Sequence, residues 1–111
     1  MYKYNAKLIR VIDGDTVDAL IDLGFNVWVK KRIRLYGINA PETRTKDLEE
    51  KKAGNAAESR LIELLWMAGN EFVLVSHGVG KYGRCLGELF IDNKTSINQL
   101  LISEGHATVY E

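Results

Sequence analysis

Ile12-Asp13-Gly14-Asp15-Thr16 is the turn from which the fold of this chain can be worked out. Apolar and polar residues alternate before it, over residues 2–13, and they alternate again over residues 16–23. A period of two is typical of half-buried strands, and Asp and Gly are the usual residues of a tight turn. The chain is therefore predicted to open with a β-hairpin, which a third strand over residues 27–36 extends into a meander.

The pattern changes over residues 45–69, where apolar residues recur every three or four positions. The residues predicted to face the core are Ala53, Ala57, Leu61, Leu64 and Leu65. This spacing predicts one long helix that Gly69 ends. Because the Gly54-Asn55 pair weakens the first turns, the helix is expected to begin near residue 54.

Two further strands are predicted over residues 72–75 and 84–91. Ser96 and Gln99 then form a capping box for a short second helix. A helix between strands three and four, with mostly antiparallel connections, predicts a mainly β fold. We expect a five-stranded Greek-key barrel of the OB type, with one domain over residues 1–111.

The composition bounds the classes of function. The chain has 111 residues, 46% apolar and 27% charged, and its formal net charge is zero. These values are typical of a globular domain, and zero net charge argues against binding nucleic acid by bulk charge alone. No run of 18 apolar residues and no apolar signal core is present. We therefore expect a cytoplasmic protein without a membrane partner, or a secreted one had a signal segment been removed.

Asp13 and Asp15 place two carboxylates around the glycine of the first turn. Ordinary hairpin chemistry explains these residues. The functional interpretation is that Asp15 directs its carboxylate into a pocket and anchors Ca²⁺ or a similar ion, with Asp13 contributing from behind or through water.

Arg34 lies near the end of the third strand, on the face that it shares with Trp28, Lys30 and Arg32. A solvated sheet face explains this pattern. The alternative is that the planar guanidinium of Arg34 holds a phosphate with two hydrogen bonds, while Lys30 and Arg32 extend a basic track for the substrate backbone.

Two further charged residues follow restricted turns. Glu42 comes directly after the only proline of the chain, and Arg84 comes after a glycine-rich turn. Hairpin chemistry explains the second turn. In the functional interpretation, Arg84 delivers a second guanidinium to the same phosphate, and Lys81 and Tyr82 contact the nucleotide.

Four motifs in order resemble the staphylococcal nuclease (thermonuclease) family. They are Ile-Asp-Gly-Asp-Thr-Val at 12–17, Arg-Leu-Tyr-Gly-Ile-Asn-Ala-Pro-Glu-Thr at 34–43, Lys-Tyr-Gly-Arg at 81–84 and Ile-Asn-Gln-Leu-Leu-Ile-Ser-Glu-Gly-His-Ala at 97–107. Their order and spacing match from about residue 7 to residue 107. The resemblance implies an OB-fold barrel that cuts DNA and RNA to 3′-phosphate products with Ca²⁺ as its cofactor.

The resemblance also implies roles for individual residues. The residues at the catalytic positions of the family are Arg34, Glu42 and Arg84, with Glu42 as the general base. The residues at its metal-binding positions are Asp15, Asn39 and Ala40, the last through its backbone carbonyl, and Asp13 corresponds to a nearby acidic residue. Asn39 stands where the family usually has a carboxylate. Because the charge of the ligands tunes Ca²⁺ affinity, this predicts weaker binding or a shifted metal preference.

The alternative is an OB module that binds nucleic acid or protein and has lost turnover. Asn39 favours this alternative, whereas the joint presence of Arg34, Glu42 and Arg84 favours the enzyme. We expect a metal-dependent endonuclease for DNA and/or RNA, and a monomer, although the sequence leaves the preferred nucleic acid and the oligomeric state open.

Overall fold

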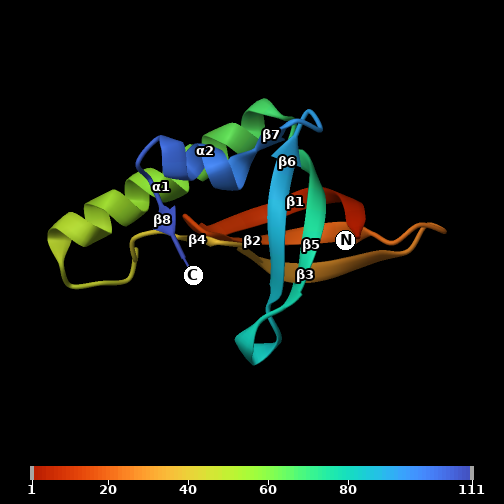
Figure 1. The fold of residues 1–111 in the computed structure, drawn as a ribbon, viewed down its shortest axis with the longest axis horizontal. Coiled ribbons are helices and arrows are strands. Elements are labelled where there is room, and N and C mark those ends of the chain that lie inside the picture. Colours follow the sequence, from red (N-terminus) through yellow and green to blue (C-terminus); the bar gives the residue numbers. More distant parts are fainter. Residues whose placement is uncertain (1, 111) are drawn as a thin grey trace.

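The computed structural model describes residues 2–110 as a β-barrel with two helices packed against it and against each other (Figure 1). The strands are β1 (Lys3–Asp13), β2 (Thr16–Asp22), β3 (Trp28–Leu35), β4 (Ile38–Asn39), β5 (Glu71–Val79), β6 (Cys85–Ile91), β7 (Thr95–Ser96) and β8 (Thr108–Val109). The helices are α1 (Leu48–Met67) and α2 (Ile97–Ser103), with a short 3₁₀ turn η1 (Lys81–Gly83). Neither helix of this region is long and apolar enough to cross a membrane.

Five of the strands close into a barrel. β1, β2 and β3 form the predicted antiparallel meander, and β5 pairs antiparallel with both β1 and β6. The parallel pairing of β3 with β6, which sets Ile33 opposite Cys85, closes the ring. The prediction of a mainly β, five-stranded OB-type barrel is therefore confirmed, with the long helix between its third and fourth strands.

The core fills the barrel and the space between the barrel and the helices. The largest fully buried side chains are Ile33, Leu35, Ile38, Leu61, Leu65, Leu89, Ile97, Leu101, Val17 and Asn98. Burying one Leu or Ile side chain contributes about 1.5–3 kcal/mol. The alternation that predicted the strands is thus also the pattern that stabilises them.

α1 begins earlier in the chain than predicted. The carboxylate of Asp47 accepts hydrogen bonds from the backbone N–H groups of Glu49 and Glu50, so the helix starts at Leu48. A side chain that satisfies these otherwise unpaired donors stabilises a helix N-terminus by roughly 1 kcal/mol. The expectation of a start near residue 54 was therefore wrong, whereas Gly69, with a positive φ of 71°, follows the end of the helix as predicted.

Gly54 has a packing role within α1. It is buried, whereas the neighbouring Ala53, which was predicted to face the core, is exposed. A Cβ atom at position 54 would lie 2.6 Å from the carbonyl oxygen of Glu42, which is closer than such atoms approach. The glycine therefore lets α1 contact the backbone of the loop that carries Glu42.

Asn98 connects α2 to the barrel. α2 begins at its N-cap Ser96, as predicted. The Asn98 amide is fully buried: its Oδ1 accepts from the backbone N of Leu89 (3.1 Å), and its Nδ2 donates to the carbonyl oxygens of Tyr36 (2.9 Å) and Gly87 (3.2 Å). These bonds hold the segment that follows β3, where the candidate site lies.

Candidate functional site

Asp15 directly precedes β2 and has a nearly buried side chain. Its Oδ2 accepts a hydrogen bond from the backbone N of Ala40 (2.9 Å), and its Oδ1 accepts one from Thr16 Oγ1 (3.0 Å). Arg34 Nη1 lies 3.1 Å from Oδ2. A buried carboxylate requires such partners, since an unpaired charge away from water is strongly disfavoured. The structure therefore brings three of the predicted site residues together.

Arg34 joins a fourth predicted residue to this group. Its Nη2 donates to Oδ1 of Asn39 (3.3 Å), and its side chain is only 13% exposed. The ring of Tyr110 lies against the guanidinium, 5.5 Å from its central carbon. Nη1 is buried and, despite its distance to Asp15, has no partner in hydrogen-bonding geometry among residues 2–110. One donor of a nearly buried guanidinium thus remains for a further acceptor, and phosphate oxygens suit it well.

Gly14 explains how Asp15 is held opposite Ala40. Gly14 has no positive φ, so the conformational freedom expected of glycine in this turn is not the reason for it. A Cβ atom there would lie 2.7 Å from the Cβ of Ala57 and 2.9 Å from the Cβ of Ala40. The first turn, the loop after β3 and α1 therefore meet at the level of their backbones, and only very small residues permit this approach.

Asp13 lies behind Asp15. Its Oδ1 accepts a hydrogen bond from the backbone N of Asp15 (3.1 Å). Burial, the largest cause, acts together with the hydrogen bond and charge of the Asp15 side chain to raise the pKa of Asp13 to about 6. The charge of Asp13 therefore changes close to neutral pH.

We call the cluster formed by Asp15, Arg34, Asn39 and Ala40 the Asp15 corner. Its oxygen atoms decide whether it can hold a metal ion. The side chains of Asp15 and Asn39 converge on one guanidinium, and Ala40 adds a backbone carbonyl to the same loop. Oxygen donors of this kind fit a hard cation such as Ca²⁺. Over residues 2–110, however, no three His, Cys, Asp or Glu side chains gather closely enough to hold a metal. A site with the single carboxylate of Asp15 and the neutral oxygens of Asn39 and Ala40 fits a metal ion that is bound weakly.

Glu42 borders this corner without joining it. Its side chain is exposed, but its backbone is fixed, since its N–H donates to a carboxylate oxygen of Glu50 (3.3 Å) and its carbonyl group lies against Gly54. None of the described contacts links the Glu42 carboxylate to Asp15.

Arg84 belongs to the connection between β5 and β6, together with Lys81 and Tyr82. Arg84 directly precedes Cys85, which pairs with Ile33, so its backbone lies one residue from the β3 ladder. Lys81 and Tyr82 occupy the tip of the β5–β6 hairpin, which projects beyond the barrel (Figure 1). All three of these predicted site side chains are exposed, Tyr82 by 93%. The structure therefore brings the backbone of Arg84 close to β3 but does not bring any of these three side chains into contact with Asp15 or Arg34.

A pocket of about 410 Å³ opens beside Arg34. Its lining residues are Arg34, Leu35, Tyr36, Gly37, Ile38, Leu86, Val109 and Tyr110. The backbone N of Tyr110 donates to the carbonyl oxygen of Gly37 (2.9 Å), and this bond helps bring the Tyr110 ring to the guanidinium. Sequence reasoning did not single out Tyr110, because no local pattern relates it to a strand that lies far away in the chain.

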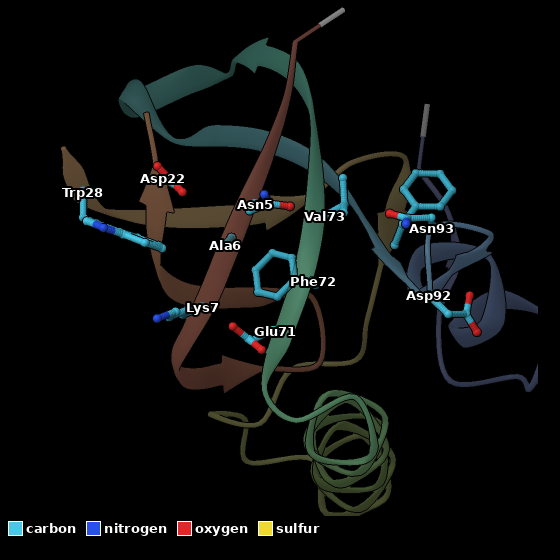
Figure 2. Close-up of a pocket in the computed structure, with 11 residues that line it drawn as sticks. Asn5, Ala6, Lys7, Asp22, Trp28, Glu71, Phe72, Val73, Asp92 and Asn93 are labelled. Atoms are coloured by element: carbon cyan, nitrogen blue, oxygen red, sulfur yellow. The ribbon is translucent and has the colours of Figure 1, made fainter. Parts of the chain in front are cut away.

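A second pocket, of about 430 Å³, lies at the opposite end of β2 and β3 (Figure 2). Asp22, the last residue of β2, and Trp28, the first residue of β3, contribute to its wall. Figure 2 shows Lys7 on the same side as Trp28, and the Lys7 ammonium lies 4.9 Å from the centre of the indole ring. None of the predicted site residues lines this pocket, so it is separate from the candidate site.

Comparisons with known proteins add to the geometry. A sequence model described as staphylococcal nuclease homologue matches residues 32–111, which is more than half of the chain. An uncharacterized endonuclease of Escherichia coli O157:H7 is 28% identical over 107 residues, covering 96% of this chain and 61% of the relative. Uncharacterized protein MJ1439 of Methanocaldococcus jannaschii is 31% identical, covering 96% and 59%. Endonuclease YhcR of Bacillus subtilis is 30% identical, covering 97% and 9%. The chain thus spans less than two thirds of the length of these relatives.

Proposed function

The chain belongs to the staphylococcal nuclease homologue family, and from this premise we propose that it is a nuclease, which hydrolyses phosphodiester bonds of DNA and/or RNA. The observation that carries the proposal is the nearly buried Arg34 guanidinium, whose Nη1 lies 3.1 Å from the Asp15 carboxylate but makes no hydrogen bond among the described residues. The names of two relatives, both endonucleases, support the same reaction.

The two arginines bind and stabilise the reacting phosphate in this proposal. Arg34 holds a phosphate oxygen from the barrel, and Arg84 approaches from the β5–β6 hairpin. Charge grows on the phosphoryl oxygens during in-line displacement, so guanidiniums that contact these oxygens bind the transition state better than the ground state. Because Arg84 is exposed without substrate, we propose that it engages when the phosphate binds.

Glu42 acts on the attacking water. Its carboxylate accepts a proton from the water as the oxygen attacks phosphorus, and the 5′-oxygen leaves with a proton from solvent. The products are a 3′-phosphate and a 5′-hydroxyl. The backbone of Glu42 is held against α1, which limits the positions that its exposed carboxylate can take.

We propose Ca²⁺ as the cofactor, held by the Asp15 carboxylate and by the oxygens of Asn39 and Ala40, with Asp13 behind them. When bound, Ca²⁺ supplies Lewis-acid polarisation of a phosphate oxygen. Since only one of these three ligands is charged, weak affinity is expected. The nucleoside next to the phosphate fits the pocket beside Arg34, and Lys81 and Tyr82 contact it from the hairpin tip.

A second candidate function is a module that binds nucleic acid without cutting it. The exposed side chains of Glu42 and Arg84 favour this alternative, because neither contacts the Asp15 corner among the described residues. Asn39, with its neutral amide, favours it as well.

The two functions differ in a cleavage assay. The protein is incubated with end-labelled single-stranded DNA and RNA, with Ca²⁺, Mg²⁺, Mn²⁺ or a chelator. Cleavage with a metal ion that stops with chelator, and that Glu42→Gln largely abolishes, supports the nuclease. Glu71→Gln is the matched control, since Glu71 lines the pocket at the other end of the barrel. Binding without cleavage under every metal would leave only the binding module.

A further inference from the structure

Asp18 joins two arginines on the outer face of the meander. Asp18 is buried, with its side chain 3% exposed, and it accepts two hydrogen bonds from Arg32, through Nε (2.8 Å) and Nη2 (3.1 Å). Arg10 donates a third bond through its Nε (3.2 Å). The two guanidiniums lower the pKa of Asp18 to about 2, the hydrogen bonds from Arg32 being the largest cause. We call Arg10, Asp18 and Arg32 the cross-strand triad.

The register of the sheet places the cross-strand triad beside the candidate site. Asp18 is paired with Arg10 of β1 and with Arg32 of β3, and the next outward-facing pair along the same ladder is Thr16 with Arg34. Residues two apart on a strand share a face and are about 6.7 Å apart. Arg32 therefore follows Arg34 in one outward row that leads away from the site.

The cross-strand triad carries two positive charges but only one negative charge. Arg32 alone engages both oxygens of Asp18, so the further ion pair with Arg10, whose own side chain is largely exposed, adds less stability. The side chains of Arg10 and Arg32 are 63% and 49% exposed. Arg10 binds Asp18 only through Nε, so among the described residues neither of its terminal nitrogens has a hydrogen-bond acceptor, and the same holds for Nη1 of Arg32. The triad is thus an oriented pair of guanidiniums with a net charge of +1.

We propose that the cross-strand triad binds a second phosphate of a single-stranded nucleic acid whose reacting phosphate lies at Arg34. An extended single strand can follow a straight row of side chains along a sheet, and a positively charged groove that tracks the backbone is a common means of binding such strands. Asp18 holds the two guanidiniums in place before binding, so fewer rotamers must be fixed when the phosphate arrives. This inference rests on the proposed function for the position of the first phosphate.

Binding measured without turnover tests the inference. Fluorescence anisotropy with labelled single-stranded DNA, in the presence of chelator, compares a dinucleotide with a hexanucleotide over a series of salt concentrations. We expect the wild type to bind the hexanucleotide more tightly than the dinucleotide and with a steeper salt dependence. Each phosphate contact contributes about 0.7 to the slope of log K against log salt for single strands. Arg10→Ala and Arg32→Ala are expected to lower the hexanucleotide slope by about that amount in total, because they share one phosphate.

The controls separate this site from bulk charge and from unfolding. Lys31→Ala removes an exposed cation of the same strand, paired with Ala19 on the other face, and should leave the slope unchanged. Arg10→Ala keeps both Asp18–Arg32 hydrogen bonds, so it tests the inference even if loss of Arg32 unfolds the barrel.

The inference would be overturned by an equal effect of Lys31→Ala, by an unchanged slope in Arg10→Ala, or by equal binding of dinucleotide and hexanucleotide by the wild type. Absence of hexanucleotide binding at low salt would overturn it as well. Binding with the expected slopes but no cleavage with any metal would refute the nuclease and leave the phosphate site standing.

Discussion

The corner around Asp15 and the tip of the β5–β6 hairpin are built in opposite ways. At the corner, both carboxylate oxygens have partners, Arg34 is nearly buried, and Gly14 packs against two alanines. At the tip, Tyr82 is 93% exposed. The loop there is closed by a hydrogen bond from the backbone N of Gly80 to the carbonyl oxygen of Arg84. Folding therefore positions the guanidinium of Arg34, whereas the side chains at the tip become ordered only when substrate binds.

Replacing Arg34 should give the largest effect. Arg34→Ala is expected to lower the single-turnover cleavage rate by roughly 10²–10³-fold, because a pre-positioned donor to the developing charge is lost. Lys81→Ala, at the tip, should cost far less, because its side chain has to be ordered by substrate. Cleavage of a labelled oligonucleotide at saturating protein measures both rates.

Folding must be controlled, because Arg34→Ala also removes a partner of a buried carboxylate. Arg34→Lys keeps the charge but loses the planar fork, and it should still lose most activity. Equal losses for Arg34→Ala and Lys81→Ala, in proteins with unchanged circular dichroism, would remove the distinction between the corner and the tip.

The packing of the first turn should give the next largest effect. Gly14→Ala is expected to lower the free energy of unfolding by about 1–3 kcal/mol, since the new Cβ would overpack against Ala57 and Ala40. Gly80→Ala, near the tip, should cost less, because its Cβ would meet only the side chain of Leu86, at 3.2 Å. Urea unfolding measures both values.

A second substitution tests the cause. Ala57→Gly removes the nearer of the two Cβ contacts, at 2.7 Å, so it should recover part of the stability lost in Gly14→Ala. If the two changes add without interaction, the close approach is not what requires glycine at this position.

The sequence was sufficient for the barrel and for the residues of the corner, because both depend on local patterns. Alternation predicted the strands, and the motifs that contain Asp15, Arg34 and Asn39 are short. The roles of these residues stay predictions. Gly14 was interpreted locally as a turn residue and Gly54 as a residue that weakens the first turns of the helix, although each is required by a segment distant in the chain.

Other residues could be found only once the strands were aligned. Asn98 satisfies backbone groups of β6 and of the segment after β3, and its surroundings depend on how α2 packs. Asp18 looked like an ordinary exposed position in an alternating strand. It meets Arg10 and Arg32 only because of the register that pairs β1, β2 and β3.

Asn39 allows a specific test of metal binding at the corner, for which we expect a smaller effect. Asn39→Asp is expected to tighten Ca²⁺ binding by about tenfold, since a second carboxylate would face the ion. Isothermal titration calorimetry of the folded protein measures the dissociation constant. Asp92→Asn, in the turn after β6, is a control for the general charge of the protein. Unchanged affinity in Asn39→Asp would show that residue 39 is not a ligand, and the corner would then bind phosphate through Arg34 alone.

The smallest expected effect is a pH dependence of stability that arises in the barrel. The tip cannot contribute a carboxylate to it, because residues 78–84 include no acidic side chain. Arg32 and Arg10 lower the pKa of Asp18 from 3.8 to about 2, so the folded state favours the ionised carboxylate. Its contribution to stability is therefore complete above about pH 4 and is lost as the pH falls toward 2. Urea unfolding between pH 5 and pH 2 should show a shallower loss for Asp18→Asn than for the wild type, whereas Glu58→Gln, on α1, should follow the wild type. Equal slopes for all three proteins would mean that Asp18 is not held by its arginines in solution, and the preorganisation on which the second phosphate site depends would be lost with it.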